Sequence, residues 1–359
     1  MNILYIMSSF NIYGGTPKKT LDLINNLKNH NSFLYVYYIN HLECKKEFEE
    51  NTVEILEGYH SNNLYKHVKS LLKFIDENNI QIVQTQFLMG ELLGGLIKLF
   101  RPKVKIIVAF VGPFSNKGIK KIITGFIYKY VDTFVYISEY VKKEKSTAYP
   151  ILKKKNSKII YNGSSERIPL NSTINIKSIS LVDVAALIDW KNATVLIEAM
   201  NILINEYKYK EIYLYFIGEG NHRKKIEEKI VQLKLENNVI LKGKQKDVGT
   251  WLKKCDIFVH PAYAEGFGVA TAEAMLAEKP IILSNAGAHP ELIKNEESGL
   301  IVDPFDAKEW AFAINRLLKE KEFSKKLSYN AKIRAQELYS IDSYVSSYDN
   351  LYNNIMKDR

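Results

Sequence analysis

Short apolar, β-branched segments alternate with segments of helical periodicity along nearly the whole chain. In the first half, strands are predicted at residues 3–7, 33–38, 80–84, 105–110, 133–137 and 158–161. In the second half, strands are predicted at 180–187, 212–217, 239–242, 257–260 and 280–284, and helices at 193–206, 222–234, 248–253 and 268–277. This alternation is typical of parallel sheets whose strands are joined by helical crossovers. We therefore expect an α/β protein with doubly wound sheets.

The length of the chain predicts two domains, because 359 residues exceed the size at which one hydrophobic core usually stops growing. Residues 166–178 contain Pro, Ser, Asn and Thr with little periodicity, which predicts a linker. We expect Rossmann-like domains at residues 1–165 and 179–335, and a helical, Tyr-rich end at 336–359 that returns to the first domain. Two such domains facing each other would bind ligands in a cleft at the carboxyl ends of their strands.

The composition excludes several classes of protein. The chain is 46% hydrophobic and 25% charged, which is unlike disordered, collagen-like or disulfide-rich proteins. It has only two cysteines, as expected for a reducing compartment. No apolar segment approaches the ~20 residues of a membrane-spanning helix, and the first residues lack the basic start of a signal peptide. We therefore expect a cytoplasmic protein.

The positive charge is confined to the first half of the chain. Residues 1–165 contain 23 Lys and Arg against 13 Asp and Glu, whereas residues 166–359 contain 27 of each kind. This asymmetry favours an anionic partner for the first domain, although a Lys-rich base composition is an alternative explanation. A membrane surface fits better than nucleic acid, for which no basic segment interleaved with aromatic residues is present.

Residues 117–132 predict a basic amphipathic helix. Three lysines (Lys117, Lys120 and Lys121) lie away from an apolar set at helical spacing that includes Ile119, Ile122, Ile123, Phe126, Ile127 and Tyr130. Such a helix is typical of proteins that lie on anionic membranes. The alternative is a crossover helix that packs its apolar face on the core and leaves its lysines in water.

The segment with the densest candidate chemistry is AYAEGFGVATAEAMLAEKPII, residues 262–282. Glu265 precedes a Gly-Phe-Gly turn, and Glu273 follows eight positions later in a helix that begins near Gly268. Free N–H groups at that helix start would point toward a ligand of Glu265. Carboxylates accept hydrogen bonds from vicinal hydroxyls. Taken alone, however, the two residues favour a more common role, Glu273 as a solvated helix residue and Glu265 as a first-turn carboxylate on the helix dipole.

This segment resembles the E-x7-E signature of retaining glycosyltransferases with the GT-B fold, specifically glycosyltransferase family four. Further segments resemble the same family in the expected order and cover nearly the whole chain: FNIYGGTPKKTLDLINNL, VYISEYVKKEKS, KIIYNGSS, LIDWKNATVLIEAM, FIGEGNHRKKIEE, HPELI and SGLIVDPFDAKEWAFAI. The resemblance implies two Rossmann-like domains, with the acceptor bound by the first and a nucleotide sugar by the second.

The resemblance also implies a role for each site residue. Glu265 would contact the donor sugar, Glu273 the ribose hydroxyls, and Lys191 the diphosphate leaving group. Backbone amides would approach the donor at glycine-rich turns and at the helix start, namely at Gly14, Gly15, Gly218, Gly266, Phe267 and Gly268. Fixed positive charge and amides would stabilise the leaving group, so no metal or other cofactor is expected.

Two positions depart from the family's pattern. Ala186 stands where an Arg usually supplements Lys191, so one diphosphate-binding cation is missing. Val111 stands where a His usually contacts the 6-hydroxyl side of the donor sugar, which suggests a 6-deoxy donor; drift in the loop is the alternative explanation. The earlier His-x-His position reads Gln84-Thr85-Gln86.

The function predicted from the sequence is transfer of a sugar, with retention, from a UDP- or GDP-type donor, with 6-deoxy and N-acetyl sugars among the candidates. The expected acceptor is a saccharide or a polyprenyl-diphosphate-linked oligosaccharide in bacterial surface polysaccharide synthesis, at the inner face of the membrane. A nucleotide-sugar epimerase on the same fold is one alternative. A non-catalytic scaffold that binds sugar nucleotides is another, motivated by Ala186 and Val111.

Overall fold

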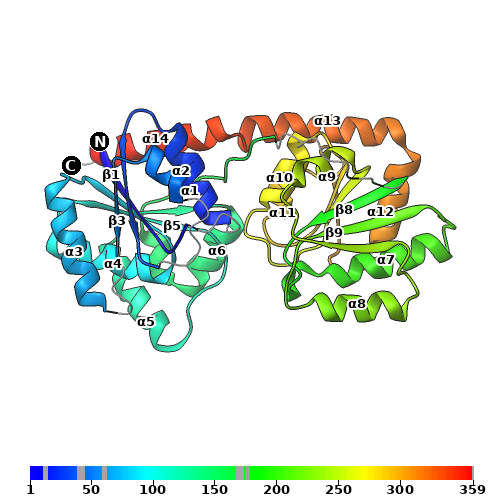
Figure 1. Cartoon of the computed structure of the whole chain (residues 1–359), viewed down its shortest axis with the longest axis horizontal. Helices are drawn as coiled ribbons and strands as arrows, with labels where there is room; N and C mark the ends of the chain where they lie inside the picture. Colours follow the sequence, from blue (N-terminus) through cyan, green and yellow to red (C-terminus); the bar gives the residue numbers. More distant parts are fainter. Residues whose placement is uncertain are drawn as a thin grey trace. The chain divides into compact units, whose positions relative to one another are not determined.

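The chain folds into two compact units (Figure 1). The computed structural model describes residues 1–10, 15–38, 45–58, 63–166, 174, 176 and 178–357. The first unit contains Met1–Gly163 together with Ile341–Arg359, and the second contains Ser164–Ser340. Each unit is built on its own parallel sheet.

The sheet of the first unit has seven strands in the order β3-β2-β1-β4-β5-β6-β7, all paired in parallel. Its strands are β1 (Asn2–Met7), β2 (Asn31–Val36), β3 (Glu54–Glu57), β4 (Ile82–Thr85), β5 (Lys105–Phe110), β6 (Thr133–Tyr136) and β7 (Ser157–Ile159). Its helices are α1 (Gly15–Asn26), α2 (Lys45–Asn51), α3 (Leu64–Glu77), α4 (Phe87–Phe100), α5 (Gly118–Ile127), η1 (Tyr128–Tyr130), α6 (Glu139–Ala148), η2 (Pro150–Lys154) and the final helix α14 (Ile341–Lys357).

The sheet of the second unit has six parallel strands in the order β10-β9-β8-β11-β12-β13. The strands are β8 (Ile179–Val184), β9 (Ile212–Ile217), β10 (Val239–Gly243), β11 (Ile257–His260), β12 (Ile281–Ser284) and β13 (Leu300–Val302). The helices are η3 (Asp189–Lys191), α7 (Ala193–Asn205), α8 (Arg223–Gln232), α9 (Val248–Lys254), α10 (Val269–Leu276), α11 (His289–Leu292), α12 (Ala307–Lys319) and α13 (Lys321–Leu338). The predicted α/β class with two parallel-sheet domains is therefore confirmed.

Helix α14 belongs to the first unit although it ends the chain. Its buried residues recur at helical spacing and pack with α1 on one side of the sheet; they are Tyr344, Tyr348, Leu351, Tyr352 and Ile355. The Tyr352 hydroxyl donates to Gln84 Oε1 at 2.7 Å and lies 3.3 Å from the Tyr5 hydroxyl. A buried polar group has to find partners, so these hydroxyls fix the position of α14 on β1 and β4.

Two strands were not predicted, and both lie at sheet edges. β3 reads Glu-Ile-Leu-Glu, with exposed or half-buried side chains, and it pairs only with β2. β13 is three residues long and pairs only with β12. β3 buries little apolar surface, so its hydrophobic pattern is weak, whereas β13 buries Leu300 and Val302 but is too short to show a period. Conversely, the strand predicted at 180–187 ends at Val184, and the residues that follow it form a loop.

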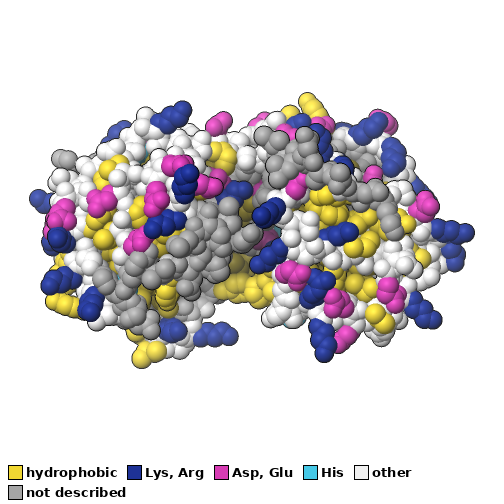
Figure 2. Space-filling view, viewed as in Figure 1, with side chains coloured by type: hydrophobic (Ala, Val, Ile, Leu, Met, Phe, Trp, Pro, Cys, Tyr) yellow, Lys and Arg dark blue, Asp and Glu magenta, His cyan; other side chains and the backbone are white. Residues whose placement is uncertain are grey.

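Helix α5 carries the apolar face for which the sequence allowed either membrane contact or packing on the core. Ile119, Ile122, Ile123 and Phe126 are exposed, with Ile119 and Ile122 above 70% exposed, whereas Ile127 is buried. The expectation that this apolar face packs on the core is therefore wrong for these four side chains. Figure 2 shows hydrophobic side chains next to Lys and Arg where Figure 1 labels α5.

The unit boundaries differ slightly from the predicted ones. The second unit extends through Ser340 rather than residue 335, because α13 continues to Leu338. Most of the predicted linker, 167–173 with residues 175 and 177, lies outside the described residues. No helix among the described residues has the length and apolar character needed to cross a bilayer.

We predict that Tyr352→Phe destabilises the first unit. The change leaves Gln84 Oε1 without its 2.7 Å donor in a buried position, which costs about 1–3 kcal/mol. Urea unfolding measures this difference in the free energy of unfolding. Tyr329→Phe is the control, since Tyr329 is 56% exposed and should be neutral. Equal stability of the two variants would contradict the role given to this hydroxyl.

Candidate active site

The strand order of the second unit reverses between β8 and β11, and polar side chains gather there. β8 pairs with both β9 and β11, so the chain leaves β8 and β11 toward opposite sides of the sheet. Such a switch point is where doubly wound sheets bind ligands. Asp183 lies near the carboxyl end of β8, and His260 is the last residue of β11.

The loops that follow these two strands carry the candidate catalytic residues. Lys191 ends the short helix η3 after β8, and Glu265 lies in the loop between β11 and α10. The two loops are tied together, because Tyr263 N donates to Trp190 O at 2.9 Å. The Tyr263 hydroxyl also donates to the Asp189 carboxylate. The loops therefore hold Lys191 and Glu265 next to each other although 74 positions separate them in the sequence.

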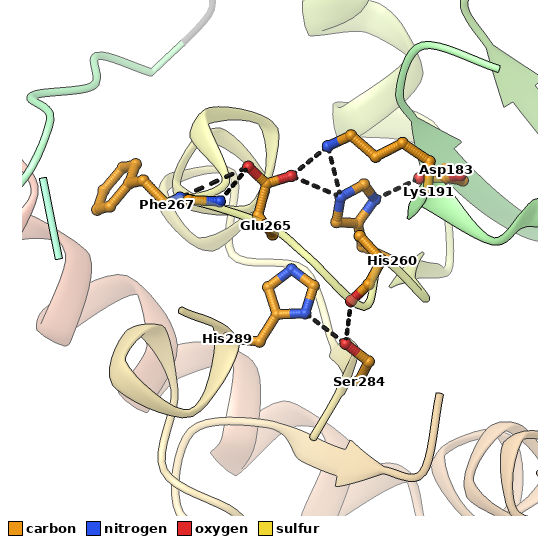
Figure 3. A network of polar contacts seen from close by, with 9 residues as sticks. Asp183, Lys191, His260, Glu265, Phe267, Ser284 and His289 are labelled. Carbon is orange, nitrogen blue, oxygen red and sulfur yellow. Dashed lines mark hydrogen bonds and ion pairs between the residues drawn. The ribbon is translucent and has the colours of Figure 1, made fainter. Parts of the chain in front are cut away.

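Glu265 is the centre of a polar network (Figure 3). The Lys191 ammonium forms an ion pair with Glu265 Oε2. His260 Nε2 lies 3.3 Å from both Lys191 Nζ and Glu265 Oε2. His260 Nδ1 lies 2.7 Å from Asp183 Oδ1. Two residues from different segments, Lys191 and His260, thus contact one carboxylate oxygen, and Asp183 holds the second of them.

The other Glu265 oxygen is bound by backbone. Gly266 N donates to Oε1 at 3.1 Å, and Phe267 N lies 3.5 Å from the same atom. Ala288 N donates to the Glu265 carbonyl at 2.9 Å. Gly287 has φ +61°, and a Cβ there would lie 2.7 Å from Glu265 N, so this close approach requires glycine. The loop after β12 thereby fixes the backbone of Glu265.

The charges around Glu265 keep it ionised. Burial by itself would raise the pKa of Glu265, but the Lys191 ammonium and the contact with His260 hold that pKa well below its ordinary value. The site therefore presents a carboxylate, which accepts hydrogen bonds, rather than a carboxylic acid.

His289 lies beside this network and is neutral. Burial and the positive charge of His260 lower the pKa of His289 to about 3. Ser284 Oγ donates to Ala262 O, so the 2.7 Å contact between Ser284 Oγ and His289 Nδ1 places the proton on Nδ1. His289 Nε2 is then a bare acceptor, and it is buried without a hydrogen-bond partner.

His260, Glu265 and His289 offer three ligand-type atoms within 4.8 Å of one another. The Lys191 ammonium, however, already contacts the Glu265 and His260 atoms of this set. The group is therefore arranged around an ammonium, and we do not assign a metal site to it.

The structure locates the other predicted site residues as follows. Gly218 has φ +153°, and a Cβ there would lie 1.8 Å from Ala185 O, so the turn after β9 packs directly on the loop after β8. Gly268 has φ +98° and caps α10. Glu273 lies within α10 and is 4% exposed, so the alternative of a solvated helix carboxylate is wrong. Gly15 begins α1, and Gly14 lies outside the described residues.

The sequence analysis missed Asp183. Its signal was a lone carboxylate inside the apolar strand Ile-Ser-Leu-Val-Asp-Val, where burial demands a partner. His260 and His289 are likewise not among the predicted site residues. Their proximity to Glu265 depends on strand order, which no local sequence pattern specifies.

Comparison with known proteins identifies the family of the second unit. Residues 164–334 match the family model of glycosyl transferases group 1. The chain is 28% identical over 276 residues to uncharacterized glycosyltransferase MJ1178 of Methanocaldococcus jannaschii, covering 75% of this chain and 74% of that protein. It is 26% identical to the capsular polysaccharide biosynthesis glycosyltransferase CapM of Staphylococcus aureus over 164 residues, covering 45% of this chain and 43% of CapM.

A solved structure shares the fold over the whole chain. The crystal structure of Anabaena HepE in complex with UDP-glucose has a TM-score of 0.83 and 18% sequence identity, covering 99% of this chain and 100% of HepE. Two parallel-sheet α/β domains of this kind constitute the GT-B fold. Residues 164–334 therefore match the glycosyl transferases group 1 family, and the chain as a whole shares the GT-B fold.

Proposed function

We propose that this glycosyltransferase moves a sugar from a nucleoside-diphosphate donor to a saccharide or lipid-linked acceptor, with retention of configuration. The observation that carries the proposal is the Lys191–Glu265 pair at the switch point of the second sheet. It combines a cation that can bind a diphosphate with an ionised carboxylate that can accept hydrogen bonds from sugar hydroxyls.

Lys191 is proposed to stabilise the leaving diphosphate. In a transfer reaction, negative charge grows on the oxygen that leaves the sugar, and a positioned ammonium stabilises it in the transition state. Lys191 extends from a short helix on a flexible stem, so its ammonium can turn from Glu265 to a phosphate. This supplies the charge that a metal ion supplies elsewhere, and we propose a metal-independent reaction on that basis.

Glu265 is proposed to hold the hydroxyls of the donor sugar on the face where positive charge develops. The amides of Gly266 and Phe267 now donate to Glu265 and keep it oriented. These two amides and the start of α10 at Gly268 are proposed to donate hydrogen bonds to the sugar and the phosphate of the donor. The buried Glu273 is proposed to accept hydrogen bonds from the ribose hydroxyls. The Gly218 turn, together with Gly14 and Gly15, is proposed to let backbone approach the donor.

The proposed donor is a UDP or GDP sugar, and UDP sugars are the first to test because the similar fold of HepE was solved with UDP-glucose. Val111 follows β5 and presents an apolar side chain, which supports the idea of a 6-deoxy sugar. The name of CapM supports a role in surface polysaccharide synthesis.

We further propose that the protein docks on the anionic cytoplasmic face of the membrane through α5. The helix exposes Ile119, Ile122, Ile123 and Phe126, and the exposed Phe114 precedes it. Lys117, Lys120 and Lys121 are exposed next to them. Burying apolar side chains at the lipid boundary while lysines meet anionic headgroups is how amphipathic helices bind membranes. A polyprenyl-diphosphate-linked acceptor would then be within reach of the first unit.

Replacing either member of the central pair should abolish transfer. We expect Lys191→Ala and Glu265→Gln each to lower kcat by ~10²-fold or more, since each removes a preorganised charge. Release of nucleoside diphosphate from a panel of UDP, GDP and dTDP sugars, 6-deoxy donors included, measures this.

The matched controls are Lys224→Ala and Glu228→Gln, an exposed ion pair of the same unit at 4.0 Å. These should keep full activity. Wild-type turnover in both Lys191→Ala and Glu265→Gln would refute the site. Binding of a sugar nucleotide without turnover by the wild type would favour the scaffold alternative, and conversion of the donor without an acceptor would favour the epimerase.

Replacing the apolar face of α5 should release the protein from membranes. We expect Ile119→Ser with Ile122→Ser to lower binding to vesicles containing anionic lipid by at least ~10-fold, because about 0.8 kcal/mol is lost for each CH₂ no longer buried. Vesicle flotation measures the bound fraction. Val231→Ser is the control, since Val231 is an apolar residue that is likewise exposed, at 60%, but lies in the second unit. Equal vesicle binding by the wild type and the Ile119→Ser, Ile122→Ser variant would exclude α5 as the docking helix.

A further inference from the structure

The charges around Glu265 balance only if His260 is positive. Asp183 and His260 are almost fully buried, with side chains 1% and 2% exposed, and Lys191 and Glu265 are largely buried. Asp183 and Glu265 contribute two negative charges, and Lys191 contributes one positive charge. Since an unbalanced buried charge is costly, a neutral His260 would leave this group with an uncompensated negative charge.

The contacts of His260 with the two carboxylates also indicate a positive ring. The Asp183 carboxylate can only accept, so His260 Nδ1 carries a proton in the 2.7 Å contact. In a neutral imidazole, Nε2 would accept from Lys191 Nζ at 3.3 Å but would turn a bare lone pair toward Glu265 Oε2, also at 3.3 Å. In an imidazolium, Nε2–H donates to that oxygen instead. Only the imidazolium makes favourable contacts with both carboxylates.

The ionisable groups that face His260 come from each neighbouring segment. Lys191 on η3 repels a positive charge on His260, whereas Asp183 on β8 and Glu265 in the loop after β11 attract it. His289 on α11 lies with its ring 5.3 Å away and is neutral. Burial and Lys191 lower the pKa of His260, but Asp183 and Glu265 more than offset them, so the pKa lies above its ordinary value of 6.5.

We propose that His260, held as an imidazolium by Asp183, is the fixed counterion of Glu265 and so leaves Lys191 free to turn to the diphosphate of the donor. This rests on the proposed function, in which Lys191 must leave Glu265 during donor binding. His260 cannot make that move, because it ends a central strand and is bound through Nδ1. His260 is thus a positioning residue that keeps Glu265 ionised and oriented when its mobile partner departs.

Charge on the His260 ring can be measured without any ligand. We expect ¹⁵N NMR of the full chain to show both ring nitrogens of His260 protonated at pH 7, with the signal identified by its loss in His260→Gln. Lys191→Met imitates the departure of Lys191 and should raise the titration midpoint of His260, because a neighbouring positive charge is removed. Lys224→Met should leave it unchanged. A neutral His260 at pH 7 in the wild type would overturn the proposal.

Kinetics distinguish positioning from a merely structural role. We expect His260→Gln to lower kcat by ~10²-fold with little change in KM for the donor, as for loss of one preorganised donor. The wild-type fall of kcat/KM at alkaline pH should disappear in this variant, and Asp183→Asn should shift it toward acid. Lys224→Gln, at an exposed position on α8 of the same unit, is the control. Wild-type kcat and an unchanged pH profile in folded His260→Gln would overturn the proposal.

Failure of the proposed function gives a different result. If the wild type turns over no sugar nucleotide, the transferase assignment fails, while the NMR titrations of wild type and Lys191→Met still decide the charge of His260.

The same charge has a consequence for stability. Because the pKa of His260 is raised in the folded protein, its stabilising effect is fully present below about pH 6.5 and is lost as pH rises through the raised pKa. We expect the difference in unfolding free energy between wild type and His260→Gln to shrink with rising pH over that window, as measured by urea unfolding. A difference that grows with pH would contradict an imidazolium.

Discussion

The arrangement of the second unit depends on neutralising one buried carboxylate. Glu265 receives an ammonium from the loop after β8, an imidazole from the end of β11 and backbone amides from the turn that it begins. These partners come from separate segments, so the loops that carry them have to hold fixed positions. The close contacts at Gly218 and Gly287 exist for this reason, because each lets one loop lie directly against another.

The parallel sheet determines where this group can form. In a doubly wound sheet the carboxyl ends of two adjacent strands diverge at the switch point, which leaves room between the loops that follow them. β8 and β11 supply Asp183 and His260 at that point, and the loops after them supply Lys191 and Glu265. Asp183 and His260 lie on strands of the sheet, which are rigid. Lys191 lies on a short helix and reaches Glu265 through a long, flexible side chain. The fixed and the mobile cation are therefore provided by elements of different rigidity.

The first unit is constructed by other means. Its sheet is covered on one side by α1 and by α14. The tyrosines of α14 bury their rings, and the Tyr352 hydroxyl contacts the Tyr5 hydroxyl of β1 and donates to Gln84 of β4. On α5, by contrast, four apolar side chains stay in water beside lysines. A crossover helix that only packed on its sheet would not keep that face exposed, which is why we connect it with the excess positive charge of residues 1–165.

The sequence by itself determined the α/β class, most strands and helices, the two-domain organisation and the two segments that contain Lys191 and Glu265. These follow from local periodicity, turn residues and recognisable motifs, which do not depend on distant contacts. The edge strands β3 and β13, the exposure of α5 and the contact of Asp183 with His260 were decided only by the tertiary structure. Pairing partners, the orientation of a helix face and the meeting of residues 77 positions apart depend on strand order and packing, which no local pattern encodes.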